Sequence, residues 1–338
     1  MIVDVIIVTY KPDKSFFELI NKLNRQTVKP NKIMVINTEE IYFSQLVYGS
    51  NFLQFHSNVQ VSHISSMEFD HGRTREKGIM ASHADIVVCM TQDAMPQDEF
   101  LIQELIKPLE DETVAVSYAR QLPREDCGMV EAYTRGYNYP DKEQRKTKAN
   151  IPNLGIKTYF CSDVCAAYNR KTFLALGGFI SNTIFNEDMI YAAKAIEAEY
   201  AVHYAAKAKV YHSHEYSFMQ QLRRNFDMGV SQADHPEVFV HISSEKEGIS
   251  MILNSFKYFC DHGNPFQFLK MIYLSGAKFT GYFWGKRYQK LSKNMILYFT
   301  SNKNYWKNIE RKHAIEGIDV KSGYGRSNQE QEMRNNKR

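Results

Sequence analysis

Short continuous runs of apolar residues alternate with amphipathic stretches through the first two-thirds of the chain. Residues 3–9 and 32–36 are rich in β-branched side chains, a pattern typical of strands buried in a parallel sheet. Between them, apolar residues recur on one face of a predicted helix, which Ser15 and Glu18 begin as a capping box. This strand-helix-strand unit predicts a right-handed crossover in a doubly wound sheet.

The same pattern continues along the chain. It predicts further strands at residues 59–65, 86–91, 114–118, 201–204 and 209–212, ordered structure at 161–168, and further helices near 74–83, 98–109, 189–198 and 217–228. Residues 120–159 are polar and aromatic without a sustained period. They predict a long loop region, mobile in places, over the active face.

The last third of the chain has a different pattern. Residues 249–297 are helical in period and dense in Phe, Tyr, Met and Leu, with many cations against the lone Asp261. Aromatic and basic residues alternate most closely at 266–291, which favours an amphipathic helix on an anionic membrane. The alternative is a helical cap on the preceding domain with solvated lysines. The polar tail from about Asp319 is predicted to be disordered.

Composition narrows the class of protein. A formal charge of +4 over 338 residues is too small to indicate nucleic-acid binding. The five cysteines are scattered and odd in number, which favours a reduced, intracellular compartment. The first apolar run is too short for a signal peptide, and no run of about 18 apolar residues predicts a transmembrane helix.

Two motifs at strand ends carry candidate metal chemistry. Asp93 follows the apolar run 86–91, and a carboxylate at the end of a central strand suits a divalent ion on a diphosphate. A turn-capping role explains Asp93 equally well. His212 and His214 follow a later strand, and period-two alternation points both imidazoles to one side, towards a metal, a phosphate or solvent.

Two further motifs lie at helix starts. Glu187 and Asp188 suit a general base for a hydroxyl group, although acidic residues at this position also complement the helix dipole. In residues 70–75, Gly72 allows close approach to a ligand, and two arginines beside a helix N-terminus suit phosphate. The alternative for this segment is a solvated loop.

The motifs VTYKP, FDHGRTR, TQDAMP, NEDMIYAAKAI and HSHEYS occur in an order that resembles the inverting family-2 glycosyltransferases of the GT-A fold. More narrowly, the chain resembles bacterial rhamnosyltransferases that build cell-surface polysaccharides. The resemblance implies an α/β, Rossmann-like, mostly parallel central sheet with flanking helices over residues 1–235. Residues 1–96 would form the nucleotide-binding half and 97–235 the acceptor half. A helical, membrane-associating extension at 236–318 and the tail at 319–338 would follow.

The resemblance also implies roles for particular residues. It assigns nucleotide-sugar binding to Thr9, Tyr10, Asp70, Gly72, Arg75, Gln92 and Asp93. It makes Asp93 the ligand of a divalent cation, Mn²⁺ or Mg²⁺, with His214 and His212 as later metal or diphosphate contacts. Asp188 becomes the catalytic base, with Glu187 as its neighbour. Thr91 replaces the first acid of the family's Asp-x-Asp, so this site carries less negative charge.

The expected reaction is transfer of a sugar, foremost L-rhamnose from dTDP-rhamnose, to a polyprenyl-diphosphate-linked glycan. The enzyme would act from the cytoplasm, peripherally on the inner face of the plasma membrane, without a nucleic-acid partner. The ion would stabilise the departing diphosphate while Asp188 deprotonates the acceptor, inverting the anomeric configuration. The alternatives are transfer of another hexose from a UDP-sugar, and a catalytically inactive GT-A module that binds in a polysaccharide assembly complex.

Overall fold

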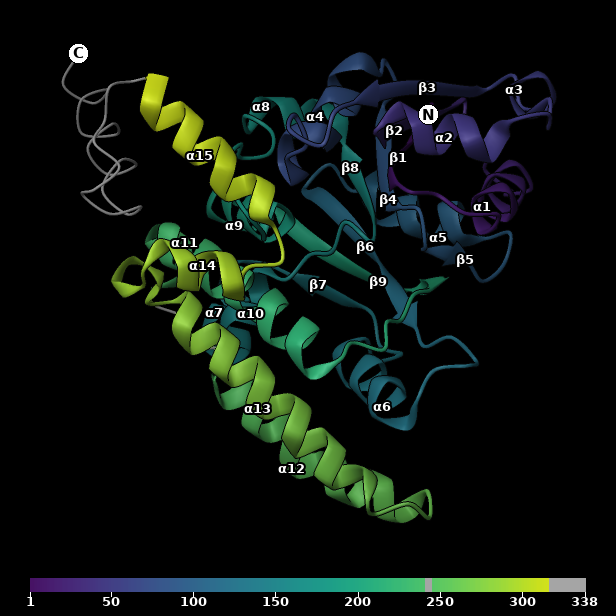
Figure 1. Ribbon diagram of the computed structural model, residues 1–338. Coiled ribbons are helices and arrows are strands. Elements are labelled where there is room, and N and C mark those ends of the chain that lie inside the picture. The colour runs from purple at the N-terminus through teal and green to yellow at the C-terminus, as the bar shows by residue number, and fades with distance from the viewer. Residues whose placement is uncertain (241–244, 316–338) are drawn as a thin grey trace.

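A computed structural model describes residues 1–240 and 245–315. Within these ranges, nine strands form one mixed sheet (Figure 1). From edge to edge the strands are β3 (Val59–Ile64), β2 (Lys32–Thr38), β1 (Val3–Tyr10), β4 (Ile86–Thr91), β8 (Cys165–Asn169), β6 (Val114–Leu122), β9 (Ala201–Tyr211) and β5 (Met95–Pro96), and β7 (Gln144–Lys146) pairs with β9. Strands β1 to β4 are parallel, as are β6 and β9. Strand β8 runs antiparallel between β4 and β6.

Helices cover both faces of the sheet because the central strands are apolar on both sides. Val5 and Ile7 of β1 pack with one set of helices, and Ile6 packs with another. The first set is α1 (Ser15–Asn24), α2 (Glu40–Val47), α3 (Phe52–Phe55) and α5 (Leu101–Ile106). The second is α4 (His71–Ala81), α8 (Arg170–Ala175) and α9 (Glu187–Glu197). The predicted α/β class is confirmed.

The C-terminal part of the described chain is helical, as predicted. It comprises α10 (Phe218–Asp234), α11 (Pro236–Phe239), α12 (Glu245–Asp261), α13 (Gln267–Gly285), α14 (Lys293–Phe299) and α15 (Lys303–Ile315). Helix α10 packs closely against α13. A Cβ atom on Gly281 would lie 2.1 Å from the Leu222 carbonyl oxygen, and one on Gly285 would lie 2.2 Å from that of Phe226. The two helices therefore touch backbone to backbone.

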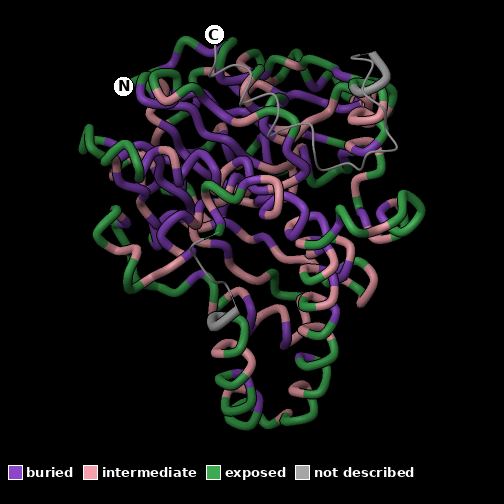
Figure 2. The backbone as a smooth tube through the Cα atoms, turned by 90° about the vertical axis from the view of Figure 1, so that its left-hand side faces the viewer, coloured by how far each residue is buried: buried purple, intermediate pink, exposed green. Residues whose placement is uncertain are grey.

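Helices α12 and α13 form a hairpin that projects from the body of the molecule (Figure 1). Its outer turns are largely exposed (Figure 2). Close to its turn, α6 (Met129–Asn138) packs Val130 and Tyr133 against Phe259 and Met271. In residues 1–240 and 245–315, every helix falls short of the length and apolarity that spanning a bilayer requires. The tail predicted from Asp319 lies outside the described residues.

The predicted long loop at 120–159 is wrong. Strand β6 continues to Leu122, and the segment then forms α6, β7 and α7 (Ile151–Leu154). The short 3-10 helices η2 (Lys148–Asn150) and η3 (Gly155–Tyr159) complete it. These pieces are too short to show a period, and α6 is stabilised by α12 and α13, which follow more than a hundred residues later.

Three local predictions also need correction. The strands expected at 201–204 and 209–212 are one strand, β9, with a register irregularity opposite β6 between Ala119 and Arg120. The helix expected at 98–109 is shortened to α5 and the 3-10 helix η1 (Lys107–Glu110), whose second residue is proline. Ser15 does not cap α1, because its hydroxyl donates to Asp13 instead.

Candidate functional site

The carboxyl ends of four strands meet at one edge of the sheet. Strands β1 and β4 are parallel, and so are β6 and β9, while β8 pairs antiparallel with both β4 and β6. All four strands therefore end at the edge where β8 begins. The predicted candidates at the ends of β1, β4 and β9 share this edge, which is where open α/β sheets bind ligands.

The structure brings Asp93, His212 and His214 into one cluster. Oδ2 of Asp93 lies 3.0 Å from Nε2 of His214 and 3.6 Å from Nε2 of His212. The two Nε2 atoms are 3.0 Å apart, and the potential ligand atoms all lie within 4.8 Å of one another. One carboxylate and two imidazoles fit a divalent transition ion such as Mn²⁺ better than Mg²⁺, which prefers oxygen ligands.

The electrostatics of this cluster are those of an ionised acid between two imidazoles. Burial alone would raise the pKa of Asp93, but the contacts with His212 and His214 outweigh it and hold the pKa well below its usual range. Burial lowers the pKa of His212 despite the neighbouring Asp93. A carboxylate beside a neutral imidazole is the protonation state that a metal ion requires.

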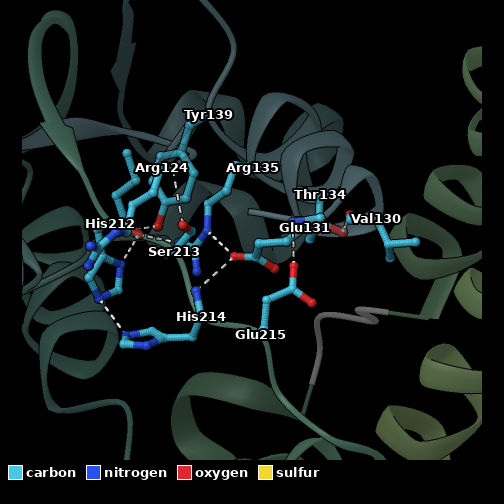
Figure 3. A network of polar contacts seen from close by, with 12 residues as sticks. Arg124, Val130, Glu131, Thr134, Arg135, Tyr139, His212, Ser213, His214 and Glu215 are labelled. Atoms are coloured by element: carbon cyan, nitrogen blue, oxygen red, sulfur yellow. Dashed lines mark hydrogen bonds and ion pairs between the residues drawn. The ribbon is translucent and has the colours of Figure 1, made fainter. Parts of the chain in front are cut away.

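Behind the histidines lies a polar network that sequence reasoning missed (Figure 3). Nδ1 of His212 is 3.0 Å from Oε1 of Gln121, the penultimate residue of β6. Arg135 of α6 donates to the same oxygen and also to Glu131, at 2.7 Å. The sequence held a signal for Gln121, because it is a polar residue at the end of a largely apolar strand. Asp93, which follows β4 by two residues, was found by the same signal. Arg135 had no comparable signal.

A second cluster surrounds the buried guanidinium of Arg75. Its Nη1 atom is 2.9 Å from Oε1 of Glu187, and its Nε atom is 3.3 Å from Oδ2 of Asp163. The other carboxylate oxygen of Asp163 accepts a hydrogen bond from the hydroxyl of Tyr168. Burial would lower the pKa of Arg75, but the two carboxylates outweigh it and raise the pKa.

Asp188 lies next to this second cluster. Glu187 is buried, whereas Asp188 is half-buried. The Asp188 carboxylate accepts a hydrogen bond from the backbone N–H of Asp163 at 3.1 Å and one from that of Met189 at 2.7 Å. Burial, and then the negative charge of Glu187, raise the pKa of Asp188 to about 7. A half-buried carboxylate with a pKa near 7 is suited to accept a proton near neutral pH.

The end of β1 carries the predicted pair Thr9 and Tyr10. Thr9 is buried and donates to the side chain of Asn37, 3.0 Å away. Tyr10 is half-exposed, and its backbone exchanges two hydrogen bonds with the amide of Gln92. The ammonium of Lys11 lies over the Tyr10 ring, 5.2 Å from its centre. This edge therefore offers an accessible aromatic ring next to a cation.

Asp70 and Gly72 are engaged within the protein. Asp70 caps α4 by accepting from the N–H of Arg73 at 2.8 Å, and it also accepts from that of Asn182. A Cβ atom on Gly72 would lie 2.3 Å from the carbonyl oxygen of Ile180. In the structure the close approach at Gly72 is thus made by the chain's own backbone, and nucleotide binding by these two residues and by Arg75 stays a prediction.

A pocket opens between the start of α10 and the segment that joins α14 to α15. It is lined by Tyr216, Gln220, Arg223, Arg224, Thr300, Ser301, Asn302, Lys303 and Asn304. Tyr216 stacks on His214, with ring centres 5.2 Å apart. The guanidinium of Arg224 lies 4.8 Å from the ring centre of Phe185, just before Glu187. The pocket is therefore cationic and borders elements of both clusters.

Comparison of the whole chain with solved structures shows the fold. A mannosyltransferase of Pyrobaculum calidifontis, solved with GDP-mannose and Mn²⁺, superposes over 90% of this chain and 87% of its own, with a TM-score of 0.53. Sequence identity is 16%, so this likeness concerns the fold alone. The GT-A fold predicted from the sequence is confirmed.

Sequence comparison gives the family. The description of the matching family is glycosyl transferase family 2, over residues 4–177. The chain is 34% identical to the O-antigen chain rhamnosyltransferase RfbN of Salmonella typhimurium, across 94% of this chain and 99% of that one. It is 35% identical to the O-antigen chain rhamnosyltransferase WbaN of Salmonella anatum, across 88% and 93%. The family match and this similarity show that the chain belongs to glycosyl transferase family 2.

Proposed function

We propose that the protein transfers L-rhamnose from dTDP-rhamnose to a growing cell-surface polysaccharide, with inversion at the anomeric carbon. The observation that carries this proposal is the similarity to two O-antigen chain rhamnosyltransferases. It extends over nearly the full length of both chains and so includes the region beyond the family match at 4–177. The acceptor is a glycan on a polyprenyl diphosphate lipid.

The reaction needs one base. The acceptor hydroxyl gives its proton to the Asp188 carboxylate as its oxygen bonds to the anomeric carbon, and the bond from that carbon to the donor's phosphate oxygen breaks. Glu187 is held by Arg75, so Asp188 is the carboxylate of this pair that is free to meet an acceptor. The backbone N–H of Asp163 fixes the direction of the Asp188 side chain.

Asp93, His212 and His214 would hold a divalent cation, Mn²⁺ in preference to Mg²⁺. When bound, such an ion supplies Lewis-acid stabilisation of the charge that develops on the leaving diphosphate. The three side chains contribute a single negative charge, because Thr91 stands two residues before Asp93 where the family carries an acid.

The nucleoside and the acceptor occupy opposite parts of the sheet edge. The nucleobase packs on the accessible face of Tyr10, beside Lys11 and the Gln92 amide, as aromatic and cationic groups suit a heterocycle. The cationic pocket next to Tyr216 receives the acceptor, because Arg224 suits the negative charge of a diphosphate-linked glycan.

The α12–α13 hairpin holds the enzyme on the cytoplasmic face of the membrane. Exposed apolar side chains project from both helices, and several are 60% or more exposed: Ile249, Leu253, Phe266, Leu269 and Phe279. Lys257 and Lys270 are exposed among them. Apolar groups with interspersed cations are complementary to an anionic bilayer, where a lipid-linked acceptor would reside.

One experiment tests the transfer. The purified protein is incubated with Mn²⁺, a synthetic lipid-linked acceptor and each of a panel of nucleotide sugars, and the products are separated. Transfer from dTDP-rhamnose above all other donors is expected. Preferential use of a UDP-hexose would overturn the choice of donor, and absence of transfer from every donor would overturn the proposed activity.

A further inference from the structure

We propose that Gln121 is a positioning residue that fixes the tautomer of His212, and that Arg135 holds Gln121 in the orientation this requires. The inference rests on the proposed role of the Asp93 cluster as a cation site. It assigns a function to the network behind the histidines (Figure 3), which includes residues from β6 and α6.

The orientation of the Gln121 amide follows from its neighbours. Arg135 can only donate hydrogen bonds, so the Gln121 atom that meets its guanidinium is the carbonyl oxygen. The amide nitrogen then donates to the hydroxyls of Tyr139 and Ser162, at 2.6 and 2.9 Å, and both can accept. Since this amide oxygen also lies 3.0 Å from Nδ1 of His212, that ring nitrogen must carry the hydrogen.

The consequence appears on the other side of the imidazole ring. With hydrogen on Nδ1, the Nε2 atom of His212 carries a lone pair, and it is this atom that lies 3.6 Å from Asp93 Oδ2. Metal ions bind the neutral imidazole through such a lone pair, and the hydrogen bond made by the opposite nitrogen selects the tautomer. Gln121 therefore presents His212 to the cation in the form that can bind it.

The same network reaches the second histidine. Glu131 accepts from Arg135 at 2.7 Å, and the same carboxylate oxygen lies 3.5 Å from the backbone nitrogen of His214. Both imidazole residues are thus connected to one arginine on α6. Burial of the Arg135–Glu131 pair, with side chains 17% and 12% exposed, shields it from solvent.

Gln121 also links the two clusters. Its amide nitrogen donates to Ser162, the residue next to Asp163, whose backbone N–H holds Asp188. Gln121, which orients His212, therefore contacts the residue next to Asp163, whose backbone N–H orients Asp188. A change at Gln121 acts first on His212, because that contact is direct.

The test measures cation binding and the tautomer separately. Mn²⁺ affinity is measured by electron paramagnetic resonance on the full chain without nucleotide, for the wild type, Gln121→Leu and Gln121→Glu. The His212 tautomer is read at pH 8 from ¹⁵N-histidine NMR spectra, with a His212→Gln sample to assign its signals. Ser117→Ala is the matched control, because the Ser117 hydroxyl is buried on the same strand and lacks a hydrogen-bond partner among the described residues.

The expected results distinguish the variants. Gln121→Leu should weaken Mn²⁺ binding by about 10- to 100-fold and mix the two tautomers, since the acceptor for Nδ1–H is gone. Gln121→Glu keeps an acceptor oxygen, and the hydroxyls of Tyr139 and Ser162 can turn to donate to it, so affinity and tautomer should stay close to those of the wild type. Ser117→Ala should change neither.

Other outcomes would overturn the inference. Wild-type Mn²⁺ affinity in a folded Gln121→Leu protein would do so. So would a wild-type spectrum with the His212 hydrogen on Nε2, a measurement that needs no Gln121 variant to fold. If the wild type shows the Nδ1–H tautomer but binds no Mn²⁺, the proposed cation site fails, and the role of Gln121 as a ligand-positioning residue fails with it.

Discussion

Arg75 Nη1 lies 2.9 Å from Glu187 Oε1, although the two residues are 112 positions apart in the chain. Both side chains are buried, and Asp163 approaches the same guanidinium from its other side. Two buried carboxylates thus share one cation next to the proposed base. The arrangement makes Arg75 a residue on which both the fold and the site depend.

Replacing Arg75 with methionine should lower the free energy of unfolding by about 3–5 kcal/mol at pH 8, because it leaves buried carboxylates without a counterion. The loss should shrink as the pH falls to 5.5. Burial raises the pKa values of Glu187 and Asp163, so both carboxyls are neutralised there and the guanidinium contributes less. Urea unfolding at both pH values measures this.

The matched control is Arg73→Met, since Arg73 is an exposed residue on the same helix. It should change stability by less than about 0.5 kcal/mol. Equal losses for the two arginine variants, or an Arg75 effect independent of pH, would contradict the ion-pair account.

Asp188→Asn should lower kcat for transfer by about 10²- to 10⁴-fold, because an amide cannot take the acceptor's proton. The protein should still fold, since the amide oxygen can accept one of the two backbone N–H groups that Asp188 accepts, that of Asp163. Transfer is measured by chromatography of the products, with circular dichroism to confirm folding. Asp141→Asn, an exposed acid elsewhere, is the control. Near-normal transfer by a folded Asp188→Asn protein would show that another group is the base.

The pH dependence of kcat/KM should reflect the ionisation of Asp188. Asp188 acts when ionised, and its pKa is raised to about 7, so kcat/KM should fall as the pH is lowered through that value. Glu187→Gln removes a neighbouring negative charge and should move this acid limb to lower pH. If the acid limb of the Glu187→Gln variant lies at the same pH as that of the wild type, Glu187 and Asp188 are not electrostatically coupled.

Removing the cation or its ligands should have a graded effect. Chelation should abolish transfer, and Mn²⁺ should restore more activity than Mg²⁺ because two of the protein's donors are imidazoles. Asp93→Ala should weaken Mn²⁺ binding by at least about 100-fold, more than a change behind the ligands does. His83→Ala, an exposed histidine outside the cluster, should bind Mn²⁺ normally. Equal Mn²⁺ affinity in the Asp93→Ala and His83→Ala variants would show that the ion binds at another site.

The hairpin should bind anionic vesicles. Flotation with phosphatidylglycerol vesicles should recover the protein, and vesicles of neutral lipid should recover less. Phe266→Ser and Leu269→Ser should each weaken binding by about tenfold or more, the effect of withdrawing one large apolar side chain from the interface. Tyr48→Ser is the control, as Tyr48, which follows α2, is 90% exposed outside the hairpin. Equal loss in all three variants would mean that the hairpin is not the contact.

The parts of the fold and the site that depend on the local spacing of apolar and polar residues could be predicted from the sequence. Asp93 ends an apolar run, and His212 and His214 are spaced by the period of a strand, so their side chains could be predicted to share one sheet edge. Val5, Ile6 and Ile7 form a continuous apolar run, which is what a strand covered on both faces requires.

What could not be predicted depends on partners that are distant in the chain. The guanidinium of Arg75 suits a phosphate as well as it suits a carboxylate, and only the folded chain shows that Glu187 lies against it. Helix α6 has only ten residues, so its stability depends on packing against α12 and α13. The contact of Gln121 with Arg135 could not be predicted either, because Arg135 comes from α6.

The glycine contact between α10 and α13 bears on how relatives of this protein can be recombined. Because Gly281 and Gly285 allow the α13 backbone to reach that of α10, no larger residue fits at either position without moving a helix. A chimera joined after residue 235 would pair α10 of one parent with α13 of the other. Its stability would depend on whether the surfaces of these two helices fit each other. A junction before Ser217, which caps α10, would keep both helices from the same parent.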